Sequence, residues 1–501
     1  MSDASETIVP RWEWRAFDRA FPLVAPTFAA LEPTGVHESD ELYLLPPAAG
    51  AIVKVRDDLM DIKTLTSVDP FGLEQWVPTM KAAFPLKAAD VATVFDALDV
   101  PTPPLRRDGY PLDLFLGELI DPAQVRPVKV RKQRVRYVVH GCVAEVTDAV
   151  ADGRPTRTIA VESEDAAGVT AAVRALGLDG YVNTNYGRGL TALVAGEPAR
   201  YAVIDVGTNS VKFHLAERDG EGAWRTVVDR AEITRLGEGL ESSTVLSPEA
   251  IERTAVAVAG MVEEAKRHHI RAIAAVGTAW HRIADNRDDV VDAVRERAGI
   301  TVDVISGEDE SRLAYLAVQS GLELGGGPVV VFDTGGGSSQ FTFGRGAHVD
   351  ERFSLDVGAV KYTEGSGLDG VVSPEVLRQA KAAISRDLAR LDDRPRPDAL
   401  VAMGGAVTNM AAVSHALTTY DPGVVHGSVL SLAEIDRQIE LYRSRDAADR
   451  RSIVGLQPKR ADVILAGACI VRTVMEKLDQ EQITVSDRGL RHGVLAERFG
   501  L

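Results

Sequence analysis

Two short segments combine an acidic residue with glycines and hydroxyl-bearing residues in the same order. The first reads Asp205-Val-Gly207-Thr208-Asn209-Ser210 and the second reads Asp333-Thr-Gly335-Gly336-Gly337-Ser338, each directly after a short apolar run. Glycine lets the backbone approach an oxyanion closely, so several N–H groups of such a turn can point at one phosphate. The carboxylate can bind Mg²⁺, which offsets phosphate charge. One such loop could be only a tight hairpin, but two copies indicate phosphate binding.

The residues around both segments show an α/β pattern, in which apolar runs alternate with amphipathic helical stretches. We expect strands at residues 201–204, 272–276 and 329–332, and helices at residues 248–268 and 288–298. Because the strand-and-loop device occurs twice, the sequence predicts two lobes of related architecture that clamp one phosphate chain.

The first half of the chain is richer in proline and in short β-type runs, with amphipathic stretches only near residues 89–98 and 165–176. Gly and Pro within residues 195–200 indicate a boundary, and the Gly-Gly-Gly-Pro stretch that ends at Pro328 indicates a second one. We therefore predict three domains, at residues 10–195, 200–323 and 324–501.

Bulk properties narrow the function further. The 501 residues carry a net charge of -17, which repels nucleic acid and anionic membranes, so a polyanionic ligand would need a local basic surface. We expect a cytoplasmic protein without membrane or nucleic-acid partners, because no signal-like start and no membrane-length apolar run is present. Cys142 and Cys469 lack partners at metal spacing, which argues against disulfides and zinc. We also expect a homodimer, although no specific motif indicates one.

Four further segments, at residues 276–282, 305–313, 403–409 and 485–493, complete an ordered set of motifs with the two loops. From Tyr201 onward the chain resembles the exopolyphosphatase and guanosine pentaphosphate phosphatase (Ppx/GppA) family, a branch of the actin-like and sugar-kinase ATPase superfamily. This resemblance implies a two-lobed, actin-like (ribonuclease H-like) α/β fold. It also implies a Mg²⁺-dependent hydrolase that removes terminal phosphate from a phosphoanhydride chain.

The resemblance implies a role for each matching residue. Glu310, expected between a strand at residues 302–305 and a helix that begins near Ser311, would orient the attacking water as a base, and Arg282 would contact phosphate. Asp205 and Asp333 would hold Mg²⁺. The phosphoryl oxygens would be bound by Gly207, Thr208, Asn209, Ser210, Gly335, Gly336, Gly337 and Ser338.

The second loop departs from the family pattern at one position. Gln340 stands where the family usually has an acid that is associated with metal binding. An amide can coordinate a cation but carries no charge, so the metal affinity could be lower.

Charged residues two apart follow the strand-like runs of the first half. Lys54 with Arg56, Lys129 with Arg131, and the row of Lys132, Arg134 and Arg136 each place positive charge on one face of a strand. Glu145, Glu162 and Glu164 add acidic groups at similar spacing. Mixed rows inside a small barrel would suit a triphosphate with a divalent metal, whereas solvated charges on an ordinary sheet are the simpler alternative.

The region from about Arg11 to Leu193 resembles the CYTH, or triphosphate tunnel, family, which implies an α+β antiparallel β-barrel. Its opening Glu-x-Glu-x-Lys motif is altered here to Arg11-Trp-Glu13-Trp-Arg15, which replaces one metal-binding acid by a base. We therefore expect polyanion binding more than hydrolysis. The expected binding residues are Arg15, Lys54, Arg56, Lys63, Arg131, Arg134, Glu145, Glu162 and Glu164.

A module that grips a polyanion beside one that cleaves it would raise the effective substrate concentration. This logic favours inorganic polyphosphate as the substrate. The alternatives are a guanosine pentaphosphate (pppGpp) 5′-phosphohydrolase, an ATP-using kinase or ATPase of the same superfamily, and a catalytically weak polyphosphate or alarmone sensor.

Overall fold

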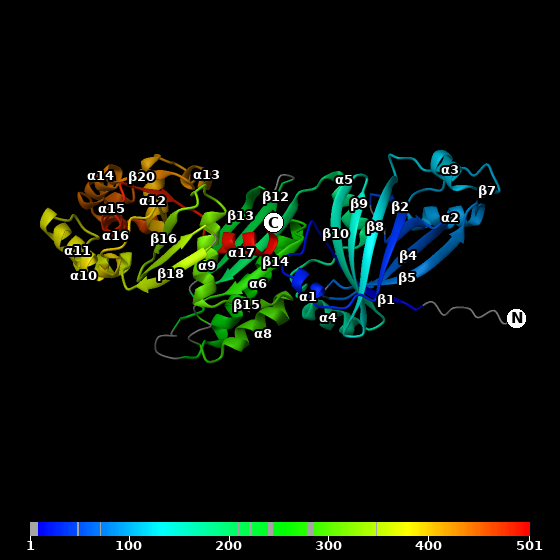
Figure 1. Cartoon of the computed structure of the whole chain (residues 1–501), viewed down its shortest axis with the longest axis horizontal. Coiled ribbons are helices and arrows are strands. Elements are labelled where there is room, and N and C mark those ends of the chain that lie inside the picture. Colours follow the sequence, from blue (N-terminus) through cyan, green and yellow to red (C-terminus); the bar gives the residue numbers. More distant parts are fainter. Residues whose placement is uncertain are drawn as a thin grey trace. The chain divides into compact units, whose positions relative to one another are not determined.

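The computed structural model describes residues 9–500 except 48–49, 71, 209, 220–222, 239–243, 279, 281–283 and 347. The chain forms two compact units (Figure 1). The first contains the chain up to Val276 and the later segment that ends at Asp303, and the second contains Val304–Gly500 with the short segment that starts at Gly277. Among the helices in the described ranges, none is both long and apolar enough to cross a membrane.

Eight antiparallel strands of the first unit form a closed barrel in the order β1-β10-β9-β8-β2-β3-β4-β5, and β5 pairs with β1 to close it. Side chains alternate between the inside and the outside of the barrel along each strand. The strands are β1 (Arg11–Asp18), β2 (Gly35–Leu45), β3 (Ala51–Arg56), β4 (Leu59–Val68), β5 (Glu74–Ala83), β8 (Arg126–Val139), β9 (Cys142–Ala151) and β10 (Arg154–Ser163).

Short helices cover the outer face of the barrel, where outward apolar side chains need shielding from water. On one side Val169 and Val173 of α4 pack on Trp14, and on another Val91 and Phe95 of α2 pack in a second apolar cluster. The covering elements are α1 (Ala25–Ala29), β6 (Leu86–Lys87), α2 (Ala88–Ala97), β7 (Gly109–Tyr110), α3 (Leu112–Leu114), a π-helix (Phe115–Leu119) and α4 (Ala166–Ala175).

Helix α5 (Tyr186–Ala195) closes one end of the barrel interior. Leu190 and Val194 of this helix pack among inward-facing side chains such as Phe17 and Trp76. A Cβ atom on Gly189 would lie 2.5 Å from the Phe17 ring, so the close approach of helix and strand requires glycine. The interior is therefore apolar at the α5 end and polar at the other end.

The chain passes from α5 into a five-stranded sheet of order β13-β12-β11-β14-β15, which belongs to the same compact unit. Backbone hydrogen bonds join the segment between α4 and α5 to the edge of this sheet, because Val182 N–H donates to Arg271 O at 2.9 Å and Ile273 N–H donates to Gly180 O at 2.7 Å. The elements are β11 (Ala199–Val206), β12 (Ser210–Arg218), β13 (Trp224–Ile233), α6 (Pro248–Arg267), β14 (Ala272–Gly277), α8 (Arg287–Ala298) and β15 (Val302–Val304).

The second unit is built on a six-stranded sheet of order β18-β17-β16-β19-β21-β20, whose core contains α16, and α9 packs against α17. Its strands are β16 (Pro328–Thr334), β17 (Ser339–Arg345), β18 (His348–Leu355), β19 (Ala399–Met403), β20 (Val429–Ser431) and β21 (Gln482–Val485). Its helices are α9 (Gly307–Gln319), α10 (Ala359–Ser366), α11 (Pro374–Asp387), α12 (Gly405–Ser414), α13 (Pro422–Val425), α14 (Leu432–Arg443), α15 (Ala447–Arg450), α16 (Ile464–Lys477) and α17 (Leu490–Phe499), with 3₁₀ turns at Ala389–Leu391 and Pro458–Arg460.

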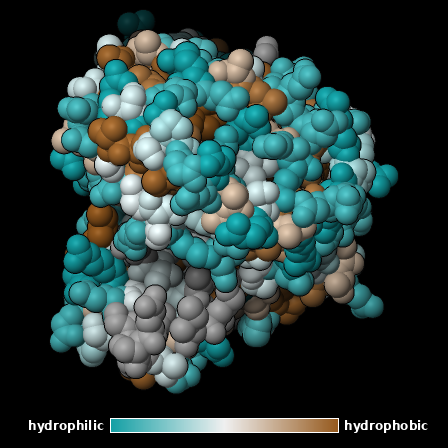
Figure 2. Space-filling view, turned by 90° about the vertical axis from the view of Figure 1, so that its left-hand side faces the viewer, coloured by the Kyte–Doolittle hydropathy of each residue, from teal (hydrophilic) through white to brown (hydrophobic). Residues whose placement is uncertain are grey.

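The surface that Figure 2 shows is mostly hydrophilic, and hydrophobic residues in the described part of it occur as small separate groups. Such scattered apolar residues are normal on a protein surface.

The closing helix gives a stability prediction. Gly189→Ala should lower the free energy of unfolding by about 1–3 kcal/mol, because the added methyl group overpacks the contact with Phe17. Gly260→Ala in α6 is the matched control, since a Cβ there meets nothing within 4 Å and should stabilise the helix by about 0.5–1 kcal/mol. Urea denaturation followed by circular dichroism measures both, and equal midpoints for wild type and Gly189→Ala would contradict the tight fit.

Candidate functional site

The first Asp-Gly loop is the hairpin turn between β11 and β12. Gly207 N–H donates to Ser210 O at 3.1 Å, and Thr208 O accepts from Gly237 N–H at 2.8 Å, so the backbone of the turn is held on both sides. Asp205 lies buried at the end of β11, with its Oδ2 atom 2.9 Å from Lys212 Nζ.

A divalent metal fits this carboxylate. The Oδ1 atom of Asp205 is buried and has no hydrogen-bond partner among the residues that the structure describes. A buried carboxylate oxygen without a donor is costly, and Mg²⁺ prefers oxygen ligands of this kind. Asp205 is therefore suited to hold the cation in the first unit.

The second loop repeats this hairpin between β16 and β17. Gly335 N–H donates to Ser338 O at 2.9 Å, and Gly336 O accepts from Val360 N–H at 2.8 Å. Asp333 pairs across the hairpin with Gln340, at the position that corresponds to Lys212 opposite Asp205 in the first loop. Gln340 Nε2 donates to Ser338 Oγ at 2.8 Å, which ties this amide to the loop.

Helix α12 begins against the carboxylate of Asp333. Gly404 precedes the helix with a φ of 89°, and a Cβ atom there would lie 2.1 Å from Asp333 Oδ1. Only glycine readily adopts this backbone conformation and also lets the backbone come this close to the Asp333 carboxylate. Asp333 therefore lies at the positive end of the α12 dipole, which favours a carboxylate.

Glu310 lies in the first turn of α9, which starts at Gly307. The expected start near Ser311 is wrong, because Ser306 caps the helix earlier: its Oγ atom accepts from Asp309 N–H at 3.0 Å. Glu310 is half-buried, whereas the side chain of Glu308 is 81% exposed and forms an ion pair with Arg352. The two glutamates therefore have different surroundings within one helical turn.

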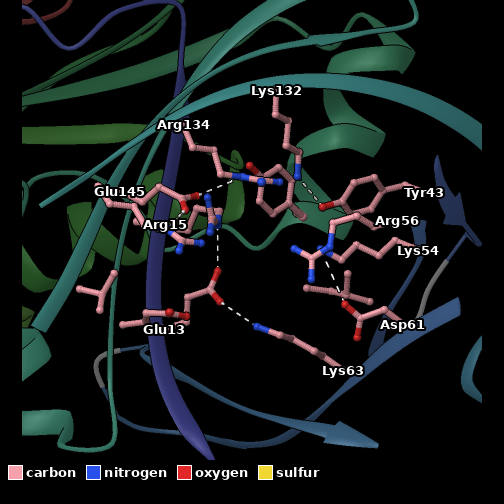
Figure 3. Close-up of a pocket in the computed structure, with 16 residues that line it drawn as sticks. Glu13, Arg15, Tyr43, Lys54, Arg56, Asp61, Lys63, Lys132, Arg134 and Glu145 are labelled. Atoms are coloured by element: carbon pink, nitrogen blue, oxygen red, sulfur yellow. Dashed lines mark hydrogen bonds and ion pairs between the residues drawn. The ribbon is translucent and has the colours of Figure 1, made fainter. Parts of the chain in front are cut away.

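The polar end of the barrel contains a cavity of about 140 Å³, into which side chains from several strands point (Figure 3). Seven basic and four acidic side chains line it. The basic residues are Arg15, Lys54, Arg56, Lys63, Lys132, Arg134 and Arg136, and the acidic residues are Glu13, Asp61, Glu145 and Glu162. The cavity therefore carries excess positive charge in a protein of opposite net charge.

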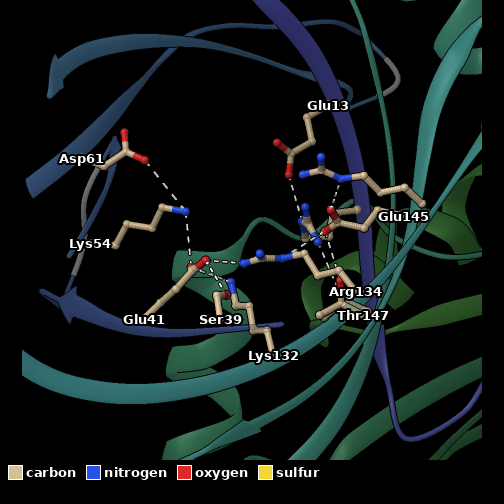
Figure 4. Close-up of polar contacts among 12 residues, drawn as sticks. Glu13, Ser39, Glu41, Lys54, Asp61, Lys132, Arg134, Glu145 and Thr147 are labelled. Atoms are coloured by element: carbon tan, nitrogen blue, oxygen red, sulfur yellow. Dashed lines mark hydrogen bonds and ion pairs between the residues drawn. The ribbon is translucent and has the colours of Figure 1, made fainter. Parts of the chain in front are cut away.

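Glu41 forms ion pairs with three of these basic side chains (Figure 4). Its Oε2 atom is 3.0 Å from Lys132 Nζ and 3.3 Å from Lys54 Nζ, and its Oε1 atom contacts Arg134. Burial alone would raise the pKa of Glu41, but these three cations outweigh it and hold the pKa well below its usual range. Glu41 is therefore a permanent anion inside the barrel.

Lys132 is enclosed by aromatic rings. Its Nζ atom donates to Tyr43 Oη at 2.6 Å and lies 3.5 Å from the centre of the Tyr186 ring. Burial lowers the pKa of Lys132 to about 7, and the nearby Arg134 acts in the same direction. Burial likewise lowers the pKa of Lys54 to about 8. Both amines can thus gain or lose a proton near neutral pH.

The second half of the chain is similar to known proteins. Residues 215–500 match the model of the Ppx/GppA phosphatase family. The chain is also 30% identical over 321 residues to Exopolyphosphatase 2 of Mycobacterium tuberculosis, and the match covers 60% of this chain and 99% of that protein.

The chain belongs to the Ppx/GppA phosphatase family. The crystal structure of the type II variant of the Aquifex aeolicus Ppx/GppA phosphatase is 31% identical, with a TM-score of 0.57, over 60% of this chain and 99% of that one. A second structure of the Aquifex aeolicus family member has a TM-score of 0.55 and also 31% identity, over 60% of this chain and 97% of that one. The two α/β sheets of this Ppx/GppA protein therefore have the expected actin-like fold, and the closed barrel precedes the matched region.

Another relative shares only this part of the protein. The "Bifunctional 3-dehydroquinate synthase/phosphatase" of Fusobacterium nucleatum is 29% identical over 307 residues, which cover 59% of this chain. The chain spans 46% of the length of that bifunctional relative.

The structure separates the barrel residues that the sequence had grouped together. Arg131 does not face the cavity: it alternates with Lys132 along β8, so it lies on the outer face with 76% of its side chain exposed. Glu164 follows the last residue of β10 and is exposed outside the cavity. The other seven predicted residues line the cavity. In the Ppx/GppA part, Asn209 and Arg282 lie outside the described residues.

Sequence reasoning missed some residues of this cluster. Glu41 is one of them: it shares the inner face of β2 with Tyr43, and the spacing of two residues was the available signal. The alternating pattern of the strands could not identify Tyr186, because this residue reaches the cavity from helix α5.

The charge of the cavity should change near neutral pH. In lysine-labelled full-length protein followed by NMR, the amines of Lys132 and Lys54 should lose their protons between about pH 6 and pH 9, because burial disfavours the ammonium form. Lys132→Met and Lys54→Met assign the two signals. Lys129→Met, on the outer face of the same strand as Lys132, should leave both unchanged. Titration of both amines only above pH 10 would contradict this description.

Proposed function

We propose that this Ppx/GppA phosphatase is an exopolyphosphatase that releases terminal phosphate from inorganic polyphosphate. The observation that carries the proposal is the repeated Asp-Gly hairpin at the ends of β11 and β16, in a chain that belongs to a phosphatase family. Backbone N–H groups of glycine-rich turns of this kind suit phosphoryl oxygens.

Hydrolysis of a phosphoanhydride needs a positioned water, a base that orients it, and positive charge on the transferred oxygens. Glu310 is our candidate for the base, because it is half-buried in the first turn of α9 and does not share the exposed ion pair of Glu308. Gly207, Thr208 and Ser210 would bind phosphoryl oxygens in one unit. Gly335, Gly336, Gly337 and Ser338 would do so in the other.

Mg²⁺ is the cofactor that we propose, with Asp205 and Asp333 as its protein ligands. When bound, it would neutralise charge on the phosphate oxygens. The partnerless Oδ1 atom of Asp205 supports this assignment. Lys212 already contributes positive charge at the other oxygen of the same carboxylate, 2.9 Å away.

The barrel would hold another part of the same polyanion. Its cavity offers seven basic side chains, which form charge-assisted hydrogen bonds with phosphate oxygens. Because backbone hydrogen bonds join the segment between α4 and α5 to the first α/β sheet, the second contact would be intramolecular. This arrangement favours a long inorganic chain over guanosine pentaphosphate as the substrate.

A polyphosphate sensor without turnover is the second candidate, and Gln340 is the observation that favours it. This neutral side chain sits opposite Asp333 and is hydrogen-bonded to Ser338 and Ser354. Tight binding of polyphosphate by a well-folded wild type that releases no phosphate would select the sensor.

The test is phosphate release from long-chain polyphosphate by the full-length protein. Glu310→Gln should lower kcat by about 10²–10⁴-fold, because the attacking water loses its base while the side-chain volume is kept. Chelation of Mg²⁺ by EDTA should abolish release, and added Mg²⁺ should restore it.

Glu308→Gln is the matched control. It lies in the same helical turn, is exposed, and should retain nearly full activity. Equal loss in the two variants, or full activity of Glu310→Gln, would refute the assignment of Glu310 as the base.

A further inference from the structure

We infer that the barrel binds the phosphate chain without a divalent metal, through its basic side chains alone. The inference rests on the proposed function for the identity of the ligand and adds how the barrel recognises it. The mixed rows of basic and acidic residues in the sequence suggested a triphosphate with a divalent metal in this barrel, and the side chains do not fit that metal.

The most deeply buried carboxylate has no oxygen left for a metal. Glu41 is fully enclosed, Lys132 and Lys54 occupy its Oε2 atom, and Arg134 occupies its Oε1 atom. Tyr43 Oη donates to Oε2 as well, at 2.9 Å. A metal cation beside Glu41 would be repelled by three positive charges at close range. This repulsion would exceed its attraction to the single carboxylate.

The carboxylates that line the cavity are also paired with bases. Glu13 Oε1 accepts from Arg15 Nε at 2.8 Å, in the motif where Arg11 replaces a second acid. Glu145 lies between two guanidinium groups, with Arg136 Nε 3.3 Å from its Oε2 atom and Arg134 Nε 3.6 Å from its Oε1 atom. These carboxylates therefore orient the basic side chains and are not placed to bind a metal cation.

The remaining two acids lie near bases too. Glu162 Oε1 is 3.2 Å from Arg11, and Asp61 Oδ2 is 3.9 Å from Lys54 Nζ. Each acid that lines the cavity thus has a basic side chain within 4.0 Å. A polyphosphate chain brings its own negative charge, and it satisfies the basic groups directly.

Two basic groups that reach the solvent are available for that contact. Arg56 and Lys63 line the cavity and keep 31% and 34% of their side chains exposed. Lys63 Nζ is 4.0 Å from Glu13, too far for a strong hydrogen bond. Since α5 and its apolar neighbours fill the other end of the barrel, the ligand enters and leaves at this polar end. A chain terminus fits such a closed cavity better than a chain that must pass through.

Calorimetric titration of tripolyphosphate into the full-length protein tests the inference. A Glu310→Gln background keeps the ligand intact, so a failure of the proposed hydrolysis leaves this measurement unaffected. Binding should persist in EDTA, and excess Mg²⁺ should weaken it, because the metal competes with the barrel for the phosphate oxygens. Arg56→Gln and Lys63→Gln should each weaken binding in EDTA about tenfold, the usual effect of one lost charge-assisted hydrogen bond.

Arg131→Gln is the matched control, because Arg131 lies on the outer face of the barrel and should leave the affinity unchanged. Two outcomes would overturn the inference. The first is binding that requires Mg²⁺. The second is binding in EDTA that is equally strong in wild type, Arg56→Gln and Lys63→Gln, since the ligand would then lie outside the barrel cavity.

Discussion

The buried ion cluster around Glu41 is the interaction on which the barrel depends. Seven basic side chains in one small cavity would repel each other strongly where water cannot screen them. Glu41 offsets part of that repulsion by contacting Lys54, Lys132 and Arg134 at once, and the rings of Tyr43 and Tyr186 face Lys132. The cluster lets a chain of net charge -17 keep a positive interior, which is what a protein that repels polyanions at long range needs to hold one.

In the proposed function, the α/β part would bind the polyanion through backbone groups and a cation held by two carboxylates. Its hairpin loops occupy matching places after β11 and β16, and the structure keeps each loop compact through main-chain hydrogen bonds such as Gly207 to Ser210 and Gly335 to Ser338. Neutral donors and a metal-binding carboxylate suit the reacting end of a chain, where charge must shift during hydrolysis. The basic side chains of the barrel suit a part of the chain that only has to be held. In the proposed function, the two regions of this Ppx/GppA protein would thus divide binding and chemistry between different kinds of positive group.

Local pattern predicted much of this arrangement, and the failures have physical causes. The strand-and-loop repeat predicted both hairpins, and the spacing of Lys132, Arg134 and Arg136 predicted one inward row, because side chains alternate along a strand. The same rule allowed two opposite faces for β8, and sequence alone did not exclude Arg131, which faces outward. The role of Glu41 follows only from the pairing of β2 with β3 and β8, because these two neighbouring strands bring three cations to it. Tyr186 and α5 contribute to the site because α5 packs into one end of the closed barrel. The periodicity of the sequence around α5 does not predict that position.

The most direct test of the account is the distribution of chain lengths while the full-length protein digests long polyphosphate in Mg²⁺. Gel electrophoresis of partly digested samples compares wild type with the Arg56→Gln, Lys63→Gln double variant. If one protein both holds and trims the chain, wild type should yield free phosphate and uncut long chains with few intermediates. The double variant should yield a ladder of intermediate lengths, because the chain dissociates between cuts. Identical ladders in both proteins would contradict the account, since the barrel would then have no part in holding the chain.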